Sequence, residues 1–251
     1  MMKTQIKLLG YDLLGDKGNE GIRYVWKNTE KTPLLESASF VNRTKGKSEN
    51  ISGYTSSVSM GCILKHLGYA CRFCRTGAVL PYSGMLSAYD IAKENIMMVL
   101  IDMKKRSSIS VDKNDREFAY MGQGEPGYSY TQLRQAIKLT DMVMDVLEQK
   151  VYRHIIATAG IPEMINAVCD DMERGYFASR VTMHFSLHAT HERDEIMPIN
   201  KIYPYQDIIK RLKKFSDLTD EKVCIGVLLF NEFKGKKQNK NFLRITQITA
   251  D

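Results

Sequence analysis

The chain has 251 residues, a formal net charge of +7, 43% hydrophobic and 26% charged residues. These values are ordinary for a globular protein and fit one large α/β domain or two small ones. We expect no membrane span and no secretory leader, because no apolar run approaches the ~20 residues that a spanning helix needs. Five cysteines in so long a chain favour a reducing cytoplasm. The positive charge fits RNA as a partner and fits a mildly basic enzyme equally well.

Residues 1–53 are rich in turn signals and predict a small β region. Expected strands in and just after it are Gln5–Leu9, Ile22–Trp26, Ala38–Asn42 and Tyr54–Met60. A basic loop, residues 42–47, separates the last two. We therefore divide the chain into an N-terminal β region, 1–53, and a core domain, 54–251.

Predicted strands alternate with predicted helices from Ser56 to Phe230. The expected strands are Glu117–Met121, Val151–Thr158, Val181–Leu187 and Val223–Phe230; the expected helices start at Ser87, span Thr131–Lys150, start at Pro162 and span Tyr205–Phe215. Residues 102–116 are charged and predict a loop. This alternation indicates an α/β fold of parallel βαβ units, either a partial or complete barrel or an open doubly wound sheet. Residues 242–249 have strand character, but the connection before them is short for a parallel crossover, so we expect antiparallel pairing, an edge position or no fixed place.

Three of the five cysteines lie within thirteen residues, at Cys62, Cys71 and Cys74. Thiolates at this spacing can converge on one metal centre. A structural zinc site takes four protein ligands, whereas three thiolates on an iron–sulfur cluster leave one iron open. From the cysteines alone, an iron–sulfur cluster, a zinc site and unliganded thiols all stay open. Cys169 and Cys224 lie in apolar patterns and are predicted to be core residues.

Polar or glycine-rich segments follow several predicted strands. They are the cysteine loop Gly61–Gly77, Gly122–Pro126, Thr158–Gly160 and Ser186–His188. In a parallel α/β sheet the carboxyl ends of the strands meet at one edge, where binding and catalysis concentrate. We therefore expect these segments to form one site.

Together these segments resemble the radical SAM superfamily and, more closely, its branch of 23S rRNA adenine methyltransferases, RlmN and Cfr. The family motifs SSQVGC, CxFCxTG, FMGMGEP, SLHA and RDEIxPINKxY are similar to Ser56–Cys62, Cys71–Gly77, Tyr120–Pro126, Ser186–Ala189 and Arg193–Tyr203. The resemblance covers about residues 54–235 and implies a partial (β/α) radical SAM barrel of parallel strands.

The resemblance implies a [4Fe-4S] cluster on Cys62, Cys71 and Cys74, with S-adenosyl-L-methionine on its open iron. The residues that it implies around this cofactor are Phe73, Gly124, Glu125, Thr158, Ser186 and His188. The implied activity is reductive cleavage to a 5′-deoxyadenosyl radical, which abstracts hydrogen from an RNA or nucleotide-related substrate. An electron donor such as flavodoxin or ferredoxin is the implied partner.

Two features depart from the family pattern. Eight residues separate Cys62 from Cys71, where the family has three, as if five were inserted around Leu64–Tyr69. Thr55 occupies the position of a cysteine that the methylating members use, and their second such cysteine lies in a C-terminal segment that has no counterpart here. The alternatives are therefore an RNA adenine C2 methyltransferase and a non-catalytic metal- or RNA-binding paralogue. His66, inside the inserted segment, is predicted to be a solvated loop residue.

Overall fold

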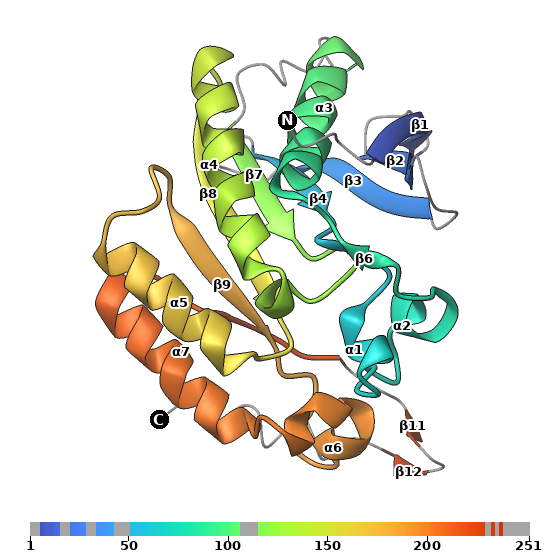
Figure 1. Ribbon diagram of the computed structural model, residues 1–251, viewed down its shortest axis with the longest axis vertical. Helices are drawn as coiled ribbons and strands as arrows, with labels where there is room; N and C mark the ends of the chain where they lie inside the picture. The colour runs from blue at the N-terminus through green and yellow to red at the C-terminus, as the bar shows by residue number, and fades with distance from the viewer. Residues whose placement is uncertain are drawn as a thin grey trace.

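The structure is a computed structural model that describes residues 6–15, 21–28, 34–42, 51–105, 115–228, 232–233 and 236–237. An eight-stranded mixed sheet is the centre of this described part, in the order β1-β2-β3-β4-β7-β8-β9-β10 (Figure 1). Its strands are β1 Ile6–Leu14, β2 Gly21–Asn28, β3 Leu34–Asn42, β4 Ile51–Ser56, β7 Asp115–Tyr120, β8 Val151–Thr158, β9 Val181–Ser186 and β10 Cys224–Gly226.

The second half of the sheet is parallel: β4, β7, β8, β9 and β10 run in one direction. The four helices that connect these strands are α3 Ala88–Lys105, α4 Tyr130–Val146, α5 Pro162–Glu173 and α7 Tyr205–Thr219. Figure 1 shows all four along one face of the sheet. The predicted α/β alternation is confirmed, and the carboxyl ends of the parallel strands meet at one edge.

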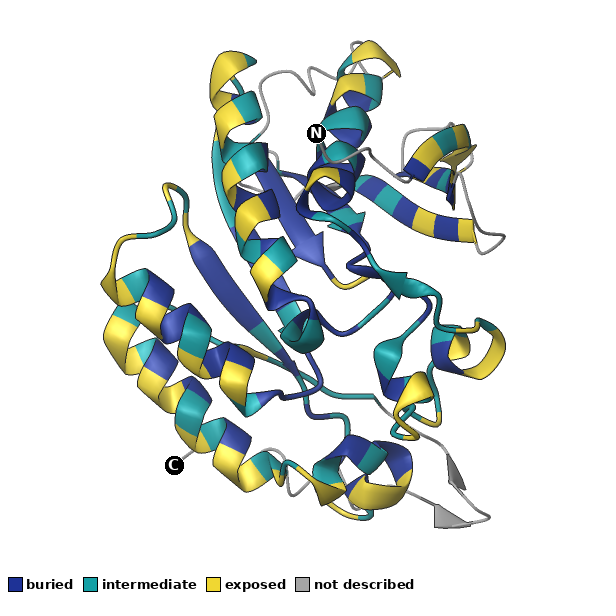
Figure 2. Cartoon of the chain, viewed as in Figure 1, coloured by how far each residue is buried: buried dark blue, intermediate teal, exposed yellow. Residues whose placement is uncertain are grey.

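Each connecting helix is amphipathic, with exposed residues turned outward and buried residues toward the sheet (Figure 2). The start of α3 is fixed by the predicted capping pair, because the Asp90 N–H donates to Ser87 Oγ at 3.1 Å and Ser87 Oγ donates to the Asp90 carboxylate at 2.7 Å. Pro162 opens α5 at its first turn, where a missing N–H costs no hydrogen bond.

The N-terminal strands extend the same sheet with antiparallel pairing, β1 to β2, β2 to β3 and β3 to β4. Trp26 anchors them, since its side chain is fully buried and its Nε1 donates to Ser37 Oγ at 2.6 Å. A boundary at residue 53 falls inside β4. The division into two domains stays a prediction.

The short elements lie mostly at the carboxyl edge of the sheet (Figure 1). They are the hairpin strands β5 Ser59–Met60 and β6 Gly84–Met85, the helices α1 Ile63–His66, α2 Arg75–Val79 and α6 Arg193–Ile196, the 3-10 turns Pro126–Tyr128 and Pro198–Lys201, and the pair β11 Glu232–Phe233 with β12 Lys236–Lys237. No helix in the described ranges is long and apolar enough to cross a membrane.

Some predicted bounds were wrong. Helix α3 runs to Lys105 and β7 starts at Asp115, so residues 102–105 and 115–116 of the loop expected over 102–116 are helix and strand. The reason is Asp102, a buried residue whose carboxylate accepts 3.0 Å hydrogen bonds from Ser39 and Tyr54 of the sheet. Helix α4 ends at Val146 rather than Lys150. The expected strand over 242–249 and most of the basic loop 42–47 lie outside the described residues.

The two cysteines outside the cluster loop have different outcomes. Cys169 is buried in α5, as predicted. The prediction for Cys224 was wrong, because this thiol is exposed at the start of β10. The apolar neighbours Val223 and Ile225 had suggested a core strand, but β10 is an edge strand that pairs only with β9 in the described sheet.

Candidate functional site

The cysteine loop leaves the sheet after β4 and turns at Gly61. This residue has φ +70°, and a Cβ would overlap the Pro81 carbonyl oxygen, so both the turn and the close packing require glycine. Cys62 then precedes the first residue of α1. Cys74 caps α2, and its Sγ accepts the Gly77 N–H at 3.5 Å.

The long gap between Cys62 and Cys71 is an ordered helical turn. It forms α1, and the Tyr69 N–H closes the turn on the Leu64 carbonyl at 2.6 Å. Leu64 is buried, which fixes the inserted segment to the core. His66 is exposed, as predicted, but lies in α1 with its ring 5.6 Å from that of Tyr82. The insertion therefore returns the chain to Cys71 instead of carrying it away.

The three thiols lie near one another and near Glu125. The pKa of Cys62 is raised to about 11 and that of Cys71 to about 12, mainly by burial, with smaller contributions from the neighbouring thiols and the Glu125 carboxylate. As they stand, no three His, Cys, Asp or Glu side chains of the described ranges are close enough to hold a metal ion. The loop gathers the thiols in one region without closing them into a finished ligand set.

Glu125 is the centre of the opposite side of the site. Its buried carboxylate accepts hydrogen bonds from Thr158 Oγ1 at 2.5 Å, the Ala159 N–H at 2.8 Å and the Gly127 N–H at 3.0 Å. Burial raises its pKa, while these three donors oppose the rise. All three donors are neutral, and no cation of the described residues contacts the carboxylate.

His188 lies at the end of β9 in a left-handed conformation, with φ +56°. Its N–H donates to the Gly226 carbonyl at 2.9 Å, and its ring meets the Phe73 ring edge-on at 4.7 Å. Burial, and then the charge of Arg193, lower its pKa to about 4, so the imidazole is neutral at pH 7. Its Nδ1 is buried without a hydrogen-bond partner in the described residues, which leaves one polar atom unsatisfied.

No protein-family model matches the chain. It is 29% identical over 180 residues to the probable dual-specificity RNA methyltransferase RlmN of Thermosipho melanesiensis, covering 70% of this chain and 46% of that protein. It is 30% identical over 184 residues to the RlmN of Pseudothermotoga lettingae, with the same coverage, and 28% identical over 175 residues to the ribosomal RNA large subunit methyltransferase Cfr of Clostridium botulinum, covering 68% and 45%.

The chain is related to the RlmN and Cfr RNA methyltransferases. It spans about half the length of these relatives. Among solved structures, a radical SAM methyltransferase from Sphaerobacter thermophilus superposes with a TM-score of 0.73 at 17% identity, over 98% of this chain and 64% of that chain. At this identity the likeness supports the fold, a partial radical SAM barrel, and not a substrate.

The site of this RlmN-like chain suits the cofactors that the relatives' class implies. Among the described residues, three thiols share one region, the buried Glu125 carboxylate contacts no cation, and the His188 Nδ1 has no hydrogen-bond partner. A buried charge without a counter-charge is costly, so the surroundings of Glu125 suit a ligand that brings an ammonium group. The individual ligand roles stay predictions.

Two residues, Gln123 and Arg193, hold the site together, and the sequence did not predict a role for either. Gln123 joins the loop after β7 to the cysteine loop: its N–H donates to Ser57 Oγ at 3.0 Å, and its Oε1 accepts the Gly61 N–H at 3.0 Å. Next to it, Gly124 has φ +104°, and a Cβ would overlap Ser59 Oγ. A glutamine among glycines carries no sequence signal for such a role.

The second is Arg193, which is buried and joins the ends of β8 and β9. It donates to the carbonyls of Leu187 at 3.0 Å and of Ser186 and Ala159 at 3.1 Å, and to Asn200 Oδ1 at 2.6 Å. Burial lowers its pKa to about 10, and the guanidinium is still charged at pH 7. Arg193 begins the segment that resembles the family motif RDEIxPINKxY, but the resemblance implies no role for this residue.

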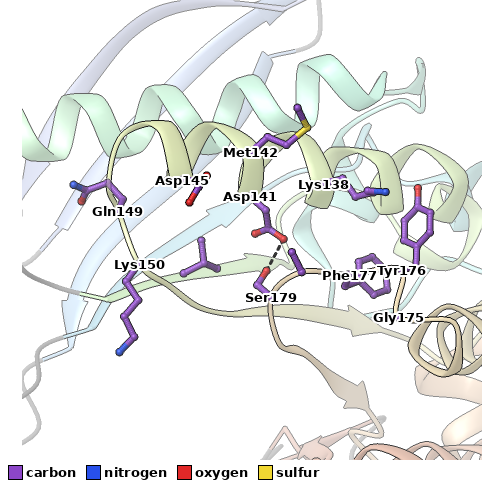
Figure 3. Close-up of a pocket in the computed structure, with 12 residues that line it drawn as sticks. Lys138, Asp141, Met142, Asp145, Gln149, Lys150, Gly175, Tyr176, Phe177 and Ser179 are labelled. Carbon is purple, nitrogen blue, oxygen red and sulfur yellow. Dashed lines mark hydrogen bonds between the residues drawn. The ribbon is translucent and has the colours of Figure 1, made fainter.

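A cavity of about 710 Å³ lies at the other end of the strands, between α4 and residues 175–179 (Figure 3). Asp141 lines this cavity, and its carboxylate accepts a hydrogen bond from Ser179 Oγ at 2.6 Å and lies 2.8 Å from His154 Nε2. None of the predicted site residues lines this cavity. It is therefore separate from the chemistry at the carboxyl ends.

Proposed function

We propose that this chain is a radical SAM enzyme. In this proposal Cys62, Cys71 and Cys74 hold a 4Fe–4S cluster, and a set of strand-end residues holds S-adenosylmethionine. That set is Phe73, Gly124, Glu125, Thr158, Ser186 and His188. The observation that carries the proposal is the Glu125 carboxylate, which is buried, contacts no cation from the described part of the chain, and lies close enough to Cys62 and Cys71 to raise the pKa of both thiols.

When bound, the cluster and S-adenosylmethionine supply an electron and a 5′-deoxyadenosyl radical. The chain's own residues orient the bound S-adenosylmethionine and shield it from water. Glu125, fixed by Thr158 and two backbone N–H groups, offers acceptors to the ammonium of the methionine moiety. His188 offers its free Nδ1 as a hydrogen-bond partner, and Phe73 against its ring excludes water from that side. The loop would close the three thiols inward as the cluster assembles.

We extend the proposal to the substrate class: an RNA or a nucleotide-related molecule. The names of the relatives and the net charge of +7 support this. The reductant would be an electron-transfer protein such as flavodoxin or ferredoxin, near the exposed Arg72 and Arg75 of the cysteine loop. Methyl transfer to adenine is the second candidate, supported by the relatives' names. Thr55 on β4 weighs against it, because a hydroxyl cannot carry a methyl group as a thioether.

The test is anaerobic purification of the full chain, reconstitution with iron and sulfide, reduction with dithionite, and an assay for 5′-deoxyadenosine from S-adenosylmethionine. We expect a cluster and a 5′-deoxyadenosine product. A Glu125→Gln variant, which keeps the size of the side chain but removes its charge, is expected to keep its cluster and lose most of the product. A chain that binds no cluster and forms no 5′-deoxyadenosine would contradict the proposal.

A further inference from the structure

The inner face of the sheet, the face turned away from α3, α4, α5 and α7, carries charged residues that the cofactor site does not use. His154 of β8 marks the opposite, helix-covered face, because its ring contacts Asp141 of α4 at 2.8 Å and the Tyr120 hydroxyl at 2.9 Å. Side chains alternate along a strand, so the adjacent Arg153 lies on the inner face. On β9, Phe185 packs into the core, which places His184 and Ser186 on the inner face too.

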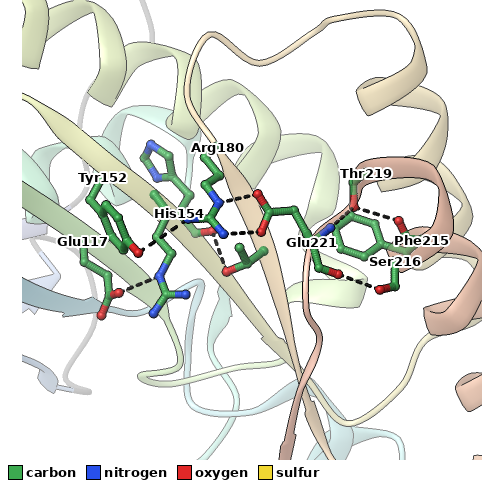
Figure 4. A network of polar contacts seen from close by, with 10 residues as sticks. Glu117, Tyr152, His154, Arg180, Phe215, Ser216, Thr219 and Glu221 are labelled. Carbon is green, nitrogen blue, oxygen red and sulfur yellow. Dashed lines mark hydrogen bonds and ion pairs between the residues drawn. The ribbon is translucent and has the colours of Figure 1, made fainter.

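Arg153 is held there by Glu117 of the neighbouring strand, and Figure 4 shows Glu117 in this network. The two residues are opposite each other in the β7–β8 register, and Arg153 Nε donates to Glu117 Oε2 at 2.6 Å. The Arg153 side chain is 28% exposed and that of Glu117 is 10% exposed. One donor of the guanidinium is thus used, and Nη1 and Nη2 make no hydrogen bond to the described residues.

His184 lies between this pair and the cofactor site. It is two residues from Ser186 on one face of β9, a separation of ~7 Å along the strand. It is half-buried, and burial and the charge of Arg153 lower its pKa, so its ring is neutral and offers one donor and one acceptor. Its register neighbours are the small Ala157 on β8 and the exposed Cys224 on β10.

We propose that Arg153 binds a phosphate group of the substrate and that His184 contacts the attached nucleoside, so that the substrate is positioned beneath the cofactor residues. The proposal rests on the proposed function, because it assumes that the substrate meets the sheet at Ser186. A guanidinium fixed through Nε presents Nη1 and Nη2 as a planar fork, the geometry that binds two oxygens of one phosphate. The neutral His184 ring lies four register positions nearer the strand ends, ~13 Å along the strands, and offers a donor or an acceptor to the nucleoside. Glu117 is a positioning residue that sets the angle of the fork.

The test measures binding directly, on the full chain with its cluster and S-adenosylmethionine present and no reductant. The probes are uridine 5′-monophosphate, uridine and inorganic phosphate, titrated by calorimetry. Wild-type protein should bind the monophosphate at least tenfold more tightly than uridine. Arg153→Gln should lose at least tenfold of that affinity, Arg153→Lys should be intermediate because it lacks the fork, and His184→Ala should lose severalfold.

Arg134→Gln is the matched control. Arg134 is 32% exposed and contacts Asp171 at 3.0 Å, a partly exposed arginine on a buried carboxylate like Arg153, but it lies on α4 on the other face. It should change monophosphate affinity by less than twofold. Thermal unfolding of each variant verifies folding, and protection of Cys224 from alkylation by the monophosphate in the wild-type chain reports the same face without any substitution.

Arg153-dependent binding of inorganic phosphate as tight as that of the monophosphate would support the anion site and assign it to phosphate alone. Equal binding of uridine and its monophosphate, equal effects of Arg153→Gln and Arg134→Gln, or an unprotected Cys224 would overturn the proposal. Because this readout needs no cleavage, a chain that forms 5′-deoxyadenosine but shows no Arg153-dependent binding would refute this inference alone.

Discussion

Thr158 Oγ1 donates to Glu125 Oε1 at 2.5 Å, and this hydrogen bond joins the end of β8 to the glycine-rich loop after β7. The two residues lie 33 positions apart in the sequence, Thr158 as the last residue of β8 and Glu125 in the loop that follows the neighbouring parallel strand β7. The carboxylate that we propose to bind the ammonium of S-adenosylmethionine is therefore oriented by the next strand of the barrel.

Thr158→Val should weaken S-adenosylmethionine binding by about tenfold, because it removes a hydrogen bond to a charged group that orients Glu125. Equilibrium binding to the cluster-loaded chain measures the effect. Thr140→Val is the control: Thr140 is a buried threonine on α4 that accepts from Asn95 Nδ2 at 3.1 Å, a contact that does not involve Glu125. Equal weakening in both variants would show that the contact does not orient the carboxylate.

Cysteine substitutions should separate ligands from bystanders. Cys62→Ala, Cys71→Ala and Cys74→Ala should each lose the bound iron and sulfide, because each removes one of three thiolates. Cys169→Ala, a change at a buried core thiol, and Cys224→Ala, a change at an exposed one, should keep the full content. A Cys62→Ala chain with an unchanged cluster would exclude Cys62 across the long gap and refute its assignment.

Arg193→Lys should destabilise the fold by about 2–4 kcal/mol, because an ammonium cannot reach the three carbonyls and the Asn200 side chain that the buried fork joins. Chemical denaturation measures the change. Arg211→Lys is the control, since Arg211 makes one surface hydrogen bond to Asn166, and we expect a change within about 0.5 kcal/mol. Similar losses in the two variants would contradict the bridging role.

Glu94 predicts a pH dependence of stability. It is fully buried in α3 with one oxygen accepting the Ser57 N–H at 3.0 Å and the other without a partner in the described residues. Burial raises its pKa from 4.5 to about 8. The stability that neutral Glu94 gives the fold is complete below pH 4.5 and is lost as the pH rises to 8, because Glu94 ionises at a lower pH in the unfolded chain than in the fold. Across this range the free energy of unfolding falls by at most ~1.4 kcal/mol per pH unit.

Glu94→Gln should flatten this dependence, so that the free energy of unfolding falls less between pH 5 and pH 8 than in the wild-type chain. Denaturation series at each pH provide the measurement. Glu163→Gln alters an exposed glutamate in the first turn of α5 and should leave the slope unchanged. Identical slopes for wild type and Glu94→Gln would mean that Glu94 is not held neutral in the fold.

The sequence predicted those parts of the fold that local patterns determine. The span of β8, the start of α5 at Pro162 and the capping pair at Ser87 each depend on residues close together in the chain. The place of β1–β3 depends on pairing between distant strands, and no local pattern specifies it. The exposure of Cys224 depends on β10 being an edge strand, which its apolar neighbours conceal.

The candidate site follows the same rule. Strand-end placement predicted that the segments would meet, and the Glu125–Thr158 and Phe73–His188 contacts agree with that expectation. Gln123 and Arg193 were not foreseen as individual residues, because both act mainly on backbone groups of distant segments. Such contacts leave no spacing pattern. The role of each predicted ligand stays a prediction until the cofactors are bound.

The most direct measurement is the electron paramagnetic resonance spectrum of the reduced, cluster-loaded chain, recorded with and without S-adenosylmethionine. A cluster held by three thiolates has an iron open to that ligand, so its addition should change the spectrum of the wild-type chain and change it less in Thr158→Val. A reduced cluster whose spectrum is the same with and without S-adenosylmethionine would contradict the account.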